Sequence, residues 1–141
     1  MGIENTMNKI IEVDWNGTGL EFTGHSPNEV KVIIDGNAQT GPSPMVMLLH
    51  SLAACSAIDV VVILERMRQT IDSLRVEVEA AREDGVAARK WDKIHLRFLL
   101  AGDIPESKAQ RAVDLSVEKY CSAYRQLECS AEITTELVQN P

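Results

Sequence analysis

Clusters of lysine and arginine are missing from this 141-residue sequence, and acidic residues outnumber basic ones. The chain has 21 Asp and Glu against 14 Lys and Arg, which gives a formal net charge of -7. Nucleic acids and anionic membrane surfaces attract basic patches, so an acidic surface disfavours both. We therefore expect neither nucleic acid nor a membrane among the partners.

Cysteine is scarce as well, with three in the chain. An odd number does not make the paired disulfide framework of a small secreted protein. The first seven residues also lack the basic and apolar regions of a secretory signal. We expect a cytoplasmic protein in which any disulfide is transient and catalytic, with residues 1–8 as a flexible tail and Met1 or Met7 as the true start.

Motifs for metals and nucleotides are not found either. No CxxC, HExxH or GxGxxG pattern occurs, and the three histidines, His25, His50 and His95, are scattered. We therefore expect no metal and no other cofactor.

Alternation of apolar and polar residues predicts six strands. Glycine-containing turns separate them, and the fourth and fifth form an expected antiparallel hairpin with a long tip. The expected strands are residues 11–15, 20–22, 30–34, 74–80, 91–100 and 131–138.

Two long helices are predicted between these strands. The first begins with Ser43 as N-cap and Pro44 at the first helical position, and we expect it to run to about Thr70. The second opens at Pro105 and Glu106, and its apolar stripe at helical spacing continues to Leu127. That stripe is Ala109, Ala112, Val113, Ser116, Val117, Tyr120, Cys121, Tyr124 and Leu127.

The first helix is apolar nearly all round from Met45 to Leu64. A membrane span is disfavoured because Asp59 would cost about 2.5–3.5 kcal/mol in mid-bilayer. We interpret it as a core helix, with a partner subunit covering the face that one small domain cannot bury. This uncovered face predicts an obligate homodimer. The order βββ-α-ββ-α-β predicts a single α+β domain over residues 1–141.

Cys55 and Cys121 fall inside the two predicted helices. A single cysteine in an apolar helix is more often a small core residue, and we read Cys129 in that way. Cys121 is in phase with the buried stripe, so the two sulfurs can meet if the helices pack together. The sequence does not choose among the three possible pairs.

Three further side chains are candidates to support a thiol site. Asp59, four residues after Cys55, is either a hydrogen-bonded structural residue or a site acid, and its charge would raise a thiol pKa. His50 is offset around the helix from Cys55, which makes a Cys–His dyad a weak interpretation. Arg125 lies four residues after Cys121 and is placed to lower the pKa of that thiol.

The segments Ser43–Pro44 through Cys55 and Lys119–Ser122 resemble the OsmC/Ohr family of osmotically induced proteins and organic hydroperoxide reductases. The resemblance implies an OsmC-like fold, with two long helices against antiparallel sheets in an intertwined homodimer. It further implies reduction of small apolar hydroperoxides in oxidative or osmotic stress defence. Cys55 would be the peroxidatic thiolate and Cys121 the resolving thiol, and a thiol or dithiol reductant would restore the pair.

The sequence departs from the family pattern beside Cys55. Well-characterised branches place a Glu directly after the helix-opening Pro, where this chain has Met45, and pair it with an N-terminal Arg. Here the first arginine is Arg66. We therefore place the chain in a divergent branch. The alternative is a non-enzymatic dimeric module that binds an apolar small molecule or senses redox state, with structural cysteines.

Overall fold

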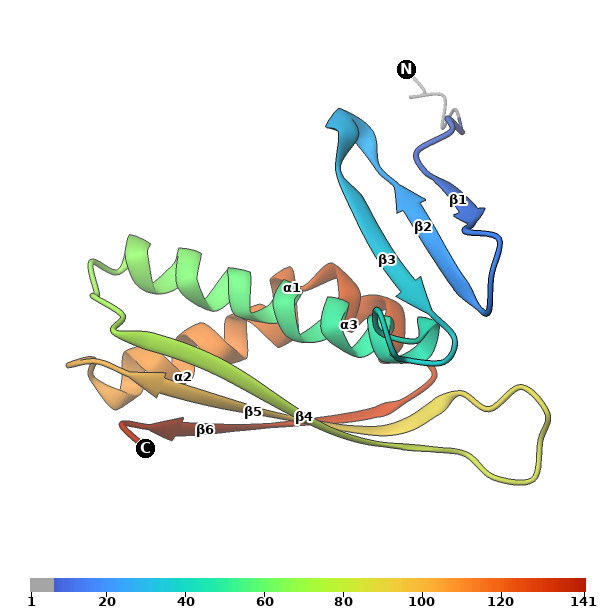
Figure 1. Cartoon of the computed structure of the whole chain (residues 1–141). Helices are drawn as coiled ribbons and strands as arrows, with labels where there is room; N and C mark the ends of the chain where they lie inside the picture. Colours follow the sequence, from blue (N-terminus) through green and yellow to red (C-terminus); the bar gives the residue numbers. More distant parts are fainter. Residues whose placement is uncertain (1–6) are drawn as a thin grey trace, which may run out of the picture. The chain divides into compact units, whose positions relative to one another are not determined.

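The computed structural model describes residues 7–141 (Figure 1). Its contacts divide the chain into two compact units, one ending at Leu48 and one running from Leu49 to Pro141, and each is described by itself. Most of the expected flexible tail lies outside the described residues, and Met7 and Asn8 are exposed without regular structure. A single domain over residues 1–141 stays a prediction.

The first unit is an antiparallel sheet in the order β1-β2-β3. Its strands are β1 (Glu12–Trp15), β2 (Glu21–His25) and β3 (Lys31–Asp35), with a short 3-10 turn over Pro27–Glu29. β2 runs past residue 22, where the expected strand ends, and includes Gly24. A Cβ at Gly24 would lie 2.9 Å from Cγ1 of Val32, so glycine here permits close strand pairing and does not end the strand.

The loop after β3 is organised by the buried carboxylate of Asp35. It accepts hydrogen bonds from the backbone N–H groups of Asn37, Gln39 and Thr40 at 2.8, 3.1 and 3.1 Å. These donors hold the pKa of Asp35 below its usual value. The chain then leads into α1 (Pro44–Arg66).

The sheet of the second unit has the order β4-β5-β6, with β4 (Ser73–Arg82), β5 (Trp91–Ala101) and β6 (Glu132–Gln139). β4 and β5 form the predicted antiparallel hairpin. β5 and β6 are parallel, which is an exception to the expected antiparallel sheets. The helical segment that connects them carries the chain back to the same end of the sheet, as a parallel crossover requires.

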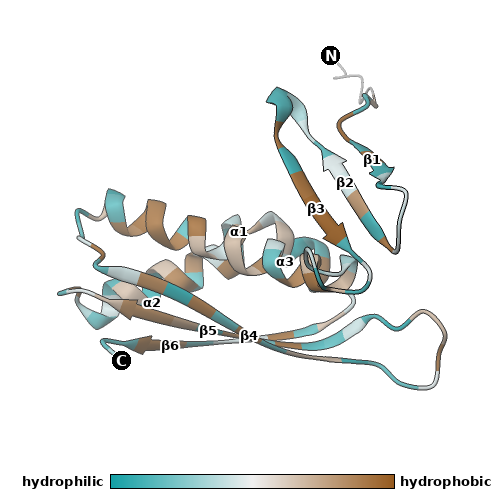
Figure 2. Cartoon of the chain, in the orientation of Figure 1, coloured by the Kyte–Doolittle hydropathy of each residue, from teal (hydrophilic) through white to brown (hydrophobic). Residues whose placement is uncertain are grey.

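The core of this unit lies between one face of the sheet and the helices (Figure 1). Side chains at alternate positions of β5 point into it, and all are at most 2% exposed: Ile94, Leu96, Phe98 and Leu100. They pack with residues from α1 and from α2 (Glu106–Leu115). The same alternation of hydropathy is visible along β4 in Figure 2.

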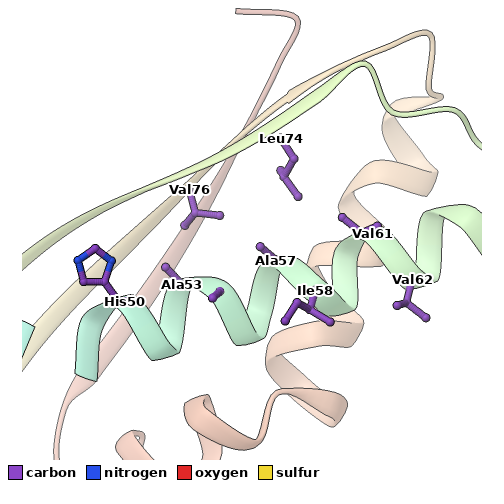
Figure 3. A pocket seen from close by; sticks show the side chains of 9 residues that line it. His50, Ala53, Ala57, Ile58, Val61, Val62, Leu74 and Val76 are labelled. Carbon is purple, nitrogen blue, oxygen red and sulfur yellow. The ribbon is translucent and has the colours of Figure 1, made fainter. Parts of the chain in front are cut away.

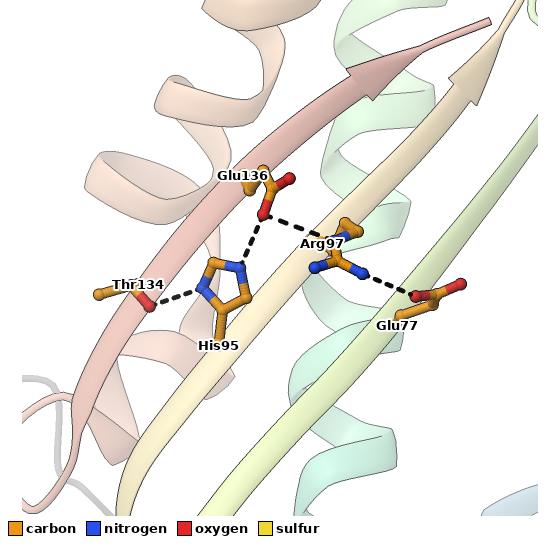
Figure 4. A network of polar contacts seen from close by, with 5 residues as sticks. All are labelled: Glu77, His95, Arg97, Thr134 and Glu136. Atoms are coloured by element: carbon orange, nitrogen blue, oxygen red, sulfur yellow. Dashed lines mark hydrogen bonds and ion pairs between the residues drawn. The ribbon is translucent and has the colours of Figure 1, made fainter. Parts of the chain in front are cut away.

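The other face of the sheet carries a polar network (Figure 4). Nδ1 of His95 lies 2.7 Å from Oγ1 of Thr134, and its Nε2 lies 3.0 Å from Oε2 of Glu136. Arg97 lies 3.4 Å from both Glu136 and Glu77. His95 and Arg97 hold the pKa of Glu136 below its usual value. These contacts tie the three strands together on the solvent side.

The expectation of a core helix is met on one face of α1. That face buries Leu52, Ser56, Val60 and Leu64 at spacings of four residues. On the opposite side of the helix Ile58 and Val62 are 61% and 37% exposed, and Leu48, one turn before Leu52, is 41% exposed. Among the described residues, α1 is the one helix long and apolar enough to cross a membrane, a criterion that core helices of soluble proteins also meet.

α1 ends at Arg66, earlier than the expected Thr70. Arg68 adopts a left-handed conformation with φ of 60°, and the N–H of Gln69 donates to the carbonyl of Leu64 at 2.9 Å. This arrangement is typical of a helix C-terminus and stops the helix without glycine.

Candidate thiol site

Cys55 lies half-buried near the middle of α1. Asp59 follows one turn later, so both side chains lie on the same side of the helix. Between them in sequence, Ser56 is fully buried and its hydroxyl donates back to the carbonyls of Leu52 and Ala53 at 2.9 and 3.0 Å. The buried serine is thereby satisfied within its own helix.

Cys121 does not lie inside a helix, and this corrects the sequence prediction. The expected second helix is divided into α2, a π-helical turn over Ser116–Tyr120, and α3 (Ser122–Leu127). Cys121 sits at the break with φ of -73° and ψ of 105°, and its sulfur accepts a hydrogen bond from the N–H of Tyr124 at 3.3 Å. It is therefore the N-cap of α3.

The π-helical turn also changes which side chains are buried. Its widened spacing leaves the N–H of Cys121 donating to the carbonyl of Ser116, five residues earlier, at 2.7 Å. Ser116 and Cys121 stay in the buried stripe, but Tyr120 is 50% exposed and departs from it. The extra residue in the π-helical turn rotates the following side chains around the helix axis, which explains why Tyr120 lies outside the buried stripe.

The fold brings Cys55 and Cys121 together. Cys121 is 4% exposed, and burial is the main reason that its pKa is raised from 9.0 to about 11. A hydrogen bond to Cys55 and the charges of Cys55 and Asp59 raise it further, whereas the Tyr124 N–H acts in the opposite direction. At neutral pH Cys121 is therefore a protonated thiol.

Cys129 takes no part in this pair. It is exposed, and its thiol lies 3.5 Å from the carbonyl of Gln126 on the same chain segment. The prediction that Cys129 packs as a core residue is therefore wrong.

Asp59 is linked to the segment before Cys121 through Ser116. The fully buried hydroxyl of Ser116 lies 3.1 Å from Oδ2 of Asp59 and 3.0 Å from the carbonyl oxygen of Ser56. Sequence reasoning treated Ser116 as one position of an apolar stripe. No sequence signal marks Ser116, because Asp59 lies 57 residues away in the chain.

His50 and Arg125 do not join the thiols. His50 is exposed and lines a groove of about 530 Å³ beside α1, together with Ala53, Ala57 and Ile58 (Figure 3). Arg125 is exposed on α3, and its backbone N–H donates to the carbonyl of Cys121 at 3.1 Å. The expected lowering of the Cys121 pKa is not found, because burial and negative neighbours dominate.

Arg66, the first arginine of the chain, lies two turns after Asp59 on α1. It lines a cavity of about 220 Å³ with Asp59, Val62, Ile63 and Tyr120. No group of three His, Cys, Asp or Glu side chains within residues 7–141 is arranged to hold a metal ion.

Residues 35–136 match the family model described as OsmC-like protein. The chain is 42% identical over 118 residues to protein YhfA of Escherichia coli K12, covering 82% of this chain and 87% of that protein. An OsmC-like protein from Mycoplasma pneumoniae superposes with a TM-score of 0.80 at 18% identity, covering 97% of this chain and 99% of that one. An organic hydroperoxide resistance protein from Elizabethkingia anophelis gives 0.70 at 10% identity, covering 98% and 100%. The last two show a shared fold, and the first two findings show that this chain belongs to the OsmC-like protein family.

Proposed function

We propose that this protein is a thiol-dependent peroxidase that reduces small apolar organic hydroperoxides in oxidative or osmotic stress defence. The observation that carries the proposal is the contact between Cys55 and Cys121. Family membership supports it, as does the shared fold with the hydroperoxide resistance protein of Elizabethkingia anophelis.

In the proposed reaction Cys55 is the nucleophile. Its thiolate attacks the outer oxygen of the hydroperoxide, an S–O bond forms and the O–O bond breaks. The outer oxygen keeps its hydrogen in the sulfenic acid, and the leaving alkoxide takes a proton from water to become the alcohol. Cys121 fits the resolving role because its raised pKa keeps it protonated, and so a poor nucleophile, until Cys55 has reacted.

The second step closes a disulfide. Cys121 attacks the sulfenic sulfur of Cys55, the S–S bond forms, the S–O bond breaks, and water leaves with the Cys121 proton. Two equivalents of a thiol, or one dithiol, then return both cysteines to the reduced state. We place this cycle in the cytoplasm, where such reductants are present, without a nucleic acid or membrane partner.

The test is to treat the reduced protein with a small alkyl hydroperoxide, count free thiols and map disulfides by mass spectrometry. Cys55→Ser is expected to abolish peroxide consumption, and Cys121→Ser to leave a sulfenic acid that oxidises further. Cys129→Ser is the matched control and should behave like the parent. If Cys55 and Cys121 stay reduced while a known thiol peroxidase in the same buffer is oxidised, the proposal fails.

We also propose that the protein is a homodimer. The exposed apolar side chains of α1, among them Ile58 and Val62, would be covered by a second copy. Removing such side chains from water stabilises an assembly by about 25 cal/mol per Å² of apolar surface. Light scattering that shows a monomer at micromolar concentration would contradict this.

A binding module is the second candidate function, favoured by the groove beside α1. Small apolar side chains such as Ala53 and Ala57 line it, with His50 at its edge (Figure 3). Such a groove suits an apolar small molecule. The module hypothesis expects an apolar fluorescent dye to bind equally well to the parent and to a protein lacking both Cys55 and Cys121, with no thiol oxidation by peroxide.

A further inference from the structure

Ser116 joins the two segments that carry Cys55 and Cys121. Its hydroxyl oxygen lies 3.0 Å from the carbonyl oxygen of Ser56, the residue after Cys55, and 3.1 Å from Oδ2 of Asp59, one turn later on α1. Its own carbonyl accepts the N–H of Cys121 at 2.7 Å and so closes the π-helical turn. One residue is therefore bonded both to α1 beside Cys55 and to the backbone of Cys121.

Burial gives these hydrogen bonds their weight. Ser116 and Ser56 are both 0% exposed, and Cys121 is 4% exposed. Breaking a hydrogen bond in such a place leaves a buried polar group without a partner, at the cost of its desolvation. The core around these residues consists of apolar side chains, whose attraction has no preferred direction. The Ser116 hydroxyl thus supplies a directional constraint on how the π-helical turn lies against α1.

A disulfide between Cys55 and Cys121 tolerates little variation in this arrangement. The Cα atoms of two disulfide-bonded cysteines usually lie about 4.4–6.8 Å apart. A displacement of about 1 Å in a reacting group can slow a reaction about 100-fold. π-Helical turns are rare and occur frequently at functional sites. A residue that fixes the π-helical turn against α1 therefore fixes the distance that the Cys121 sulfur must cross.

We propose that Ser116 is a positioning residue that holds Cys121 in register with Cys55 and so sets the rate at which their disulfide closes. It acts through its bonds to α1 and through the backbone of Cys121, and it takes no proton from either thiol. This inference deepens the proposed function and rests on it for the pairing of the two thiols.

The experiment measures disulfide closure without peroxide, in a Cys129→Ser background. The Cys55 thiolate attacks dithiobis-nitrobenzoate, a mixed disulfide forms, and the first coloured thionitrobenzoate leaves. Cys121 then loses its proton to solvent and attacks the Cys55 sulfur, the protein disulfide forms, and the second thionitrobenzoate leaves. Stopped-flow absorbance separates the two releases, because the first depends on the reagent concentration and the second does not.

Ser116→Thr and Ser116→Val are the matched pair, because threonine and valine have nearly the same shape and differ in the hydroxyl. Closure in Ser116→Val is expected to be about 10- to 100-fold slower than in the parent, and Ser116→Thr should recover most of the rate. The first release should be alike in both variants. The pH profile of closure should be lowered in parallel at every pH in Ser116→Val, because positioning changes the rate without changing the ionisation of Cys121.

Two further sites separate positioning from stability. Asp59→Ala removes one of the two bonds from its half-buried end, so it should slow closure less than Ser116→Val does. Asp59→Asn keeps an oxygen acceptor and should lie between Asp59→Ala and the parent. Val113→Ala opens a cavity at a fully buried position of α2 and lowers stability, but it removes no hydrogen bond and should leave closure unchanged.

Closure in Ser116→Val as fast as in Ser116→Thr would overturn the inference, because the hydroxyl would then contribute nothing. Closure in Asp59→Ala as fast as in the parent would overturn it too, and this comparison needs no substitution at a fully buried position. A parent that releases the first thionitrobenzoate but never the second would show that the thiols are not held within reach. If a hydroperoxide leaves Cys55 reduced while the Ser116 hydroxyl still governs closure, the proposed peroxidase function fails and the positioning role stands.

Discussion

The Cys121 thiol, at the N-cap of α3, contacts Cys55 in the middle of α1. The pair therefore depends on tertiary packing, which distinguishes it from two cysteines close in sequence. The pair is asymmetric in its exposure to solvent, because Cys121 is buried and Cys55 is half-buried.

This asymmetry predicts the order in which the thiols react with an alkylating reagent. Cys129 is exposed and should be modified first, which makes it an internal control in the same molecule. Cys121 should be modified last, and its rate should rise with pH towards about 11 because burial and the hydrogen bond to Cys55 favour the protonated form. Peptide mass spectrometry after timed alkylation measures this, and a rate that levels off near the ordinary thiol pKa would contradict it.

The two buried serines provide a matched pair for stability. Ser116→Ala removes the hydroxyl that joins Asp59 to the π-turn, and we expect it to lower the free energy of unfolding by about 1–2 kcal/mol. Ser56→Ala removes a hydroxyl bonded to carbonyls of its own helix, and alanine favours helix, so the change should stay within about 0.5 kcal/mol. Urea unfolding at one fixed protein concentration compares the two. Equal losses would show that the contact with Asp59 adds nothing.

The strands and helix starts were predictable because their signals are local. Alternation placed β4 and β5 within two residues, and Ser43 with Pro44 marked the start of α1 correctly. The direction of β6 was not predictable, since a period of two is the same in parallel and antiparallel strands. The expected strand over residues 20–22 ended too early, because glycine is disfavoured inside strands and Gly24 nevertheless lies within β2.

The candidate site was predicted only in outline. The sequence singled out Cys55 and Cys121 as candidates, which stays a prediction. It did not show the break at Cys121, because the stretch from Glu106 to Leu127 has neither glycine nor proline. The π-turn there leaves the apolar stripe nearly intact, so periodicity alone reads one helix. Ser116 and Arg66 became relevant only through contacts made by distant segments of chain.

The Asp35 loop predicts a dependence of stability on pH. Its folded-state pKa lies below the ordinary value of 3.8, because backbone N–H groups of Asn37, Thr40 and Gln39 bind the charged form. The stabilisation is thus present above that value and is lost as pH falls through the lowered folded pKa. Asp35→Asn should lower Tm at neutral pH, and the difference from the parent should shrink in acid.

Circular dichroism melts across this pH range measure the effect, with the exposed Asp103→Asn as control. A Tm difference between Asp35→Asn and the parent that is the same at neutral pH and in acid would show that the charge of Asp35 has no part in it.

The exposed apolar side of α1 predicts that an acidic substitution there weakens the proposed homodimer. Ile58 is 61% exposed and is among the residues that line the 530 Å³ groove. In the proposed homodimer, Ile58→Asp would place an unpaired carboxylate in an apolar contact, which costs several kcal/mol or more unless it is protonated or solvated. We expect this variant to shift from dimer to monomer in sedimentation, whereas Gln110→Asp, an exposed change on α2, should leave the mass unchanged. A dimer that persists in Ile58→Asp at the same concentration would place the interface on a different surface.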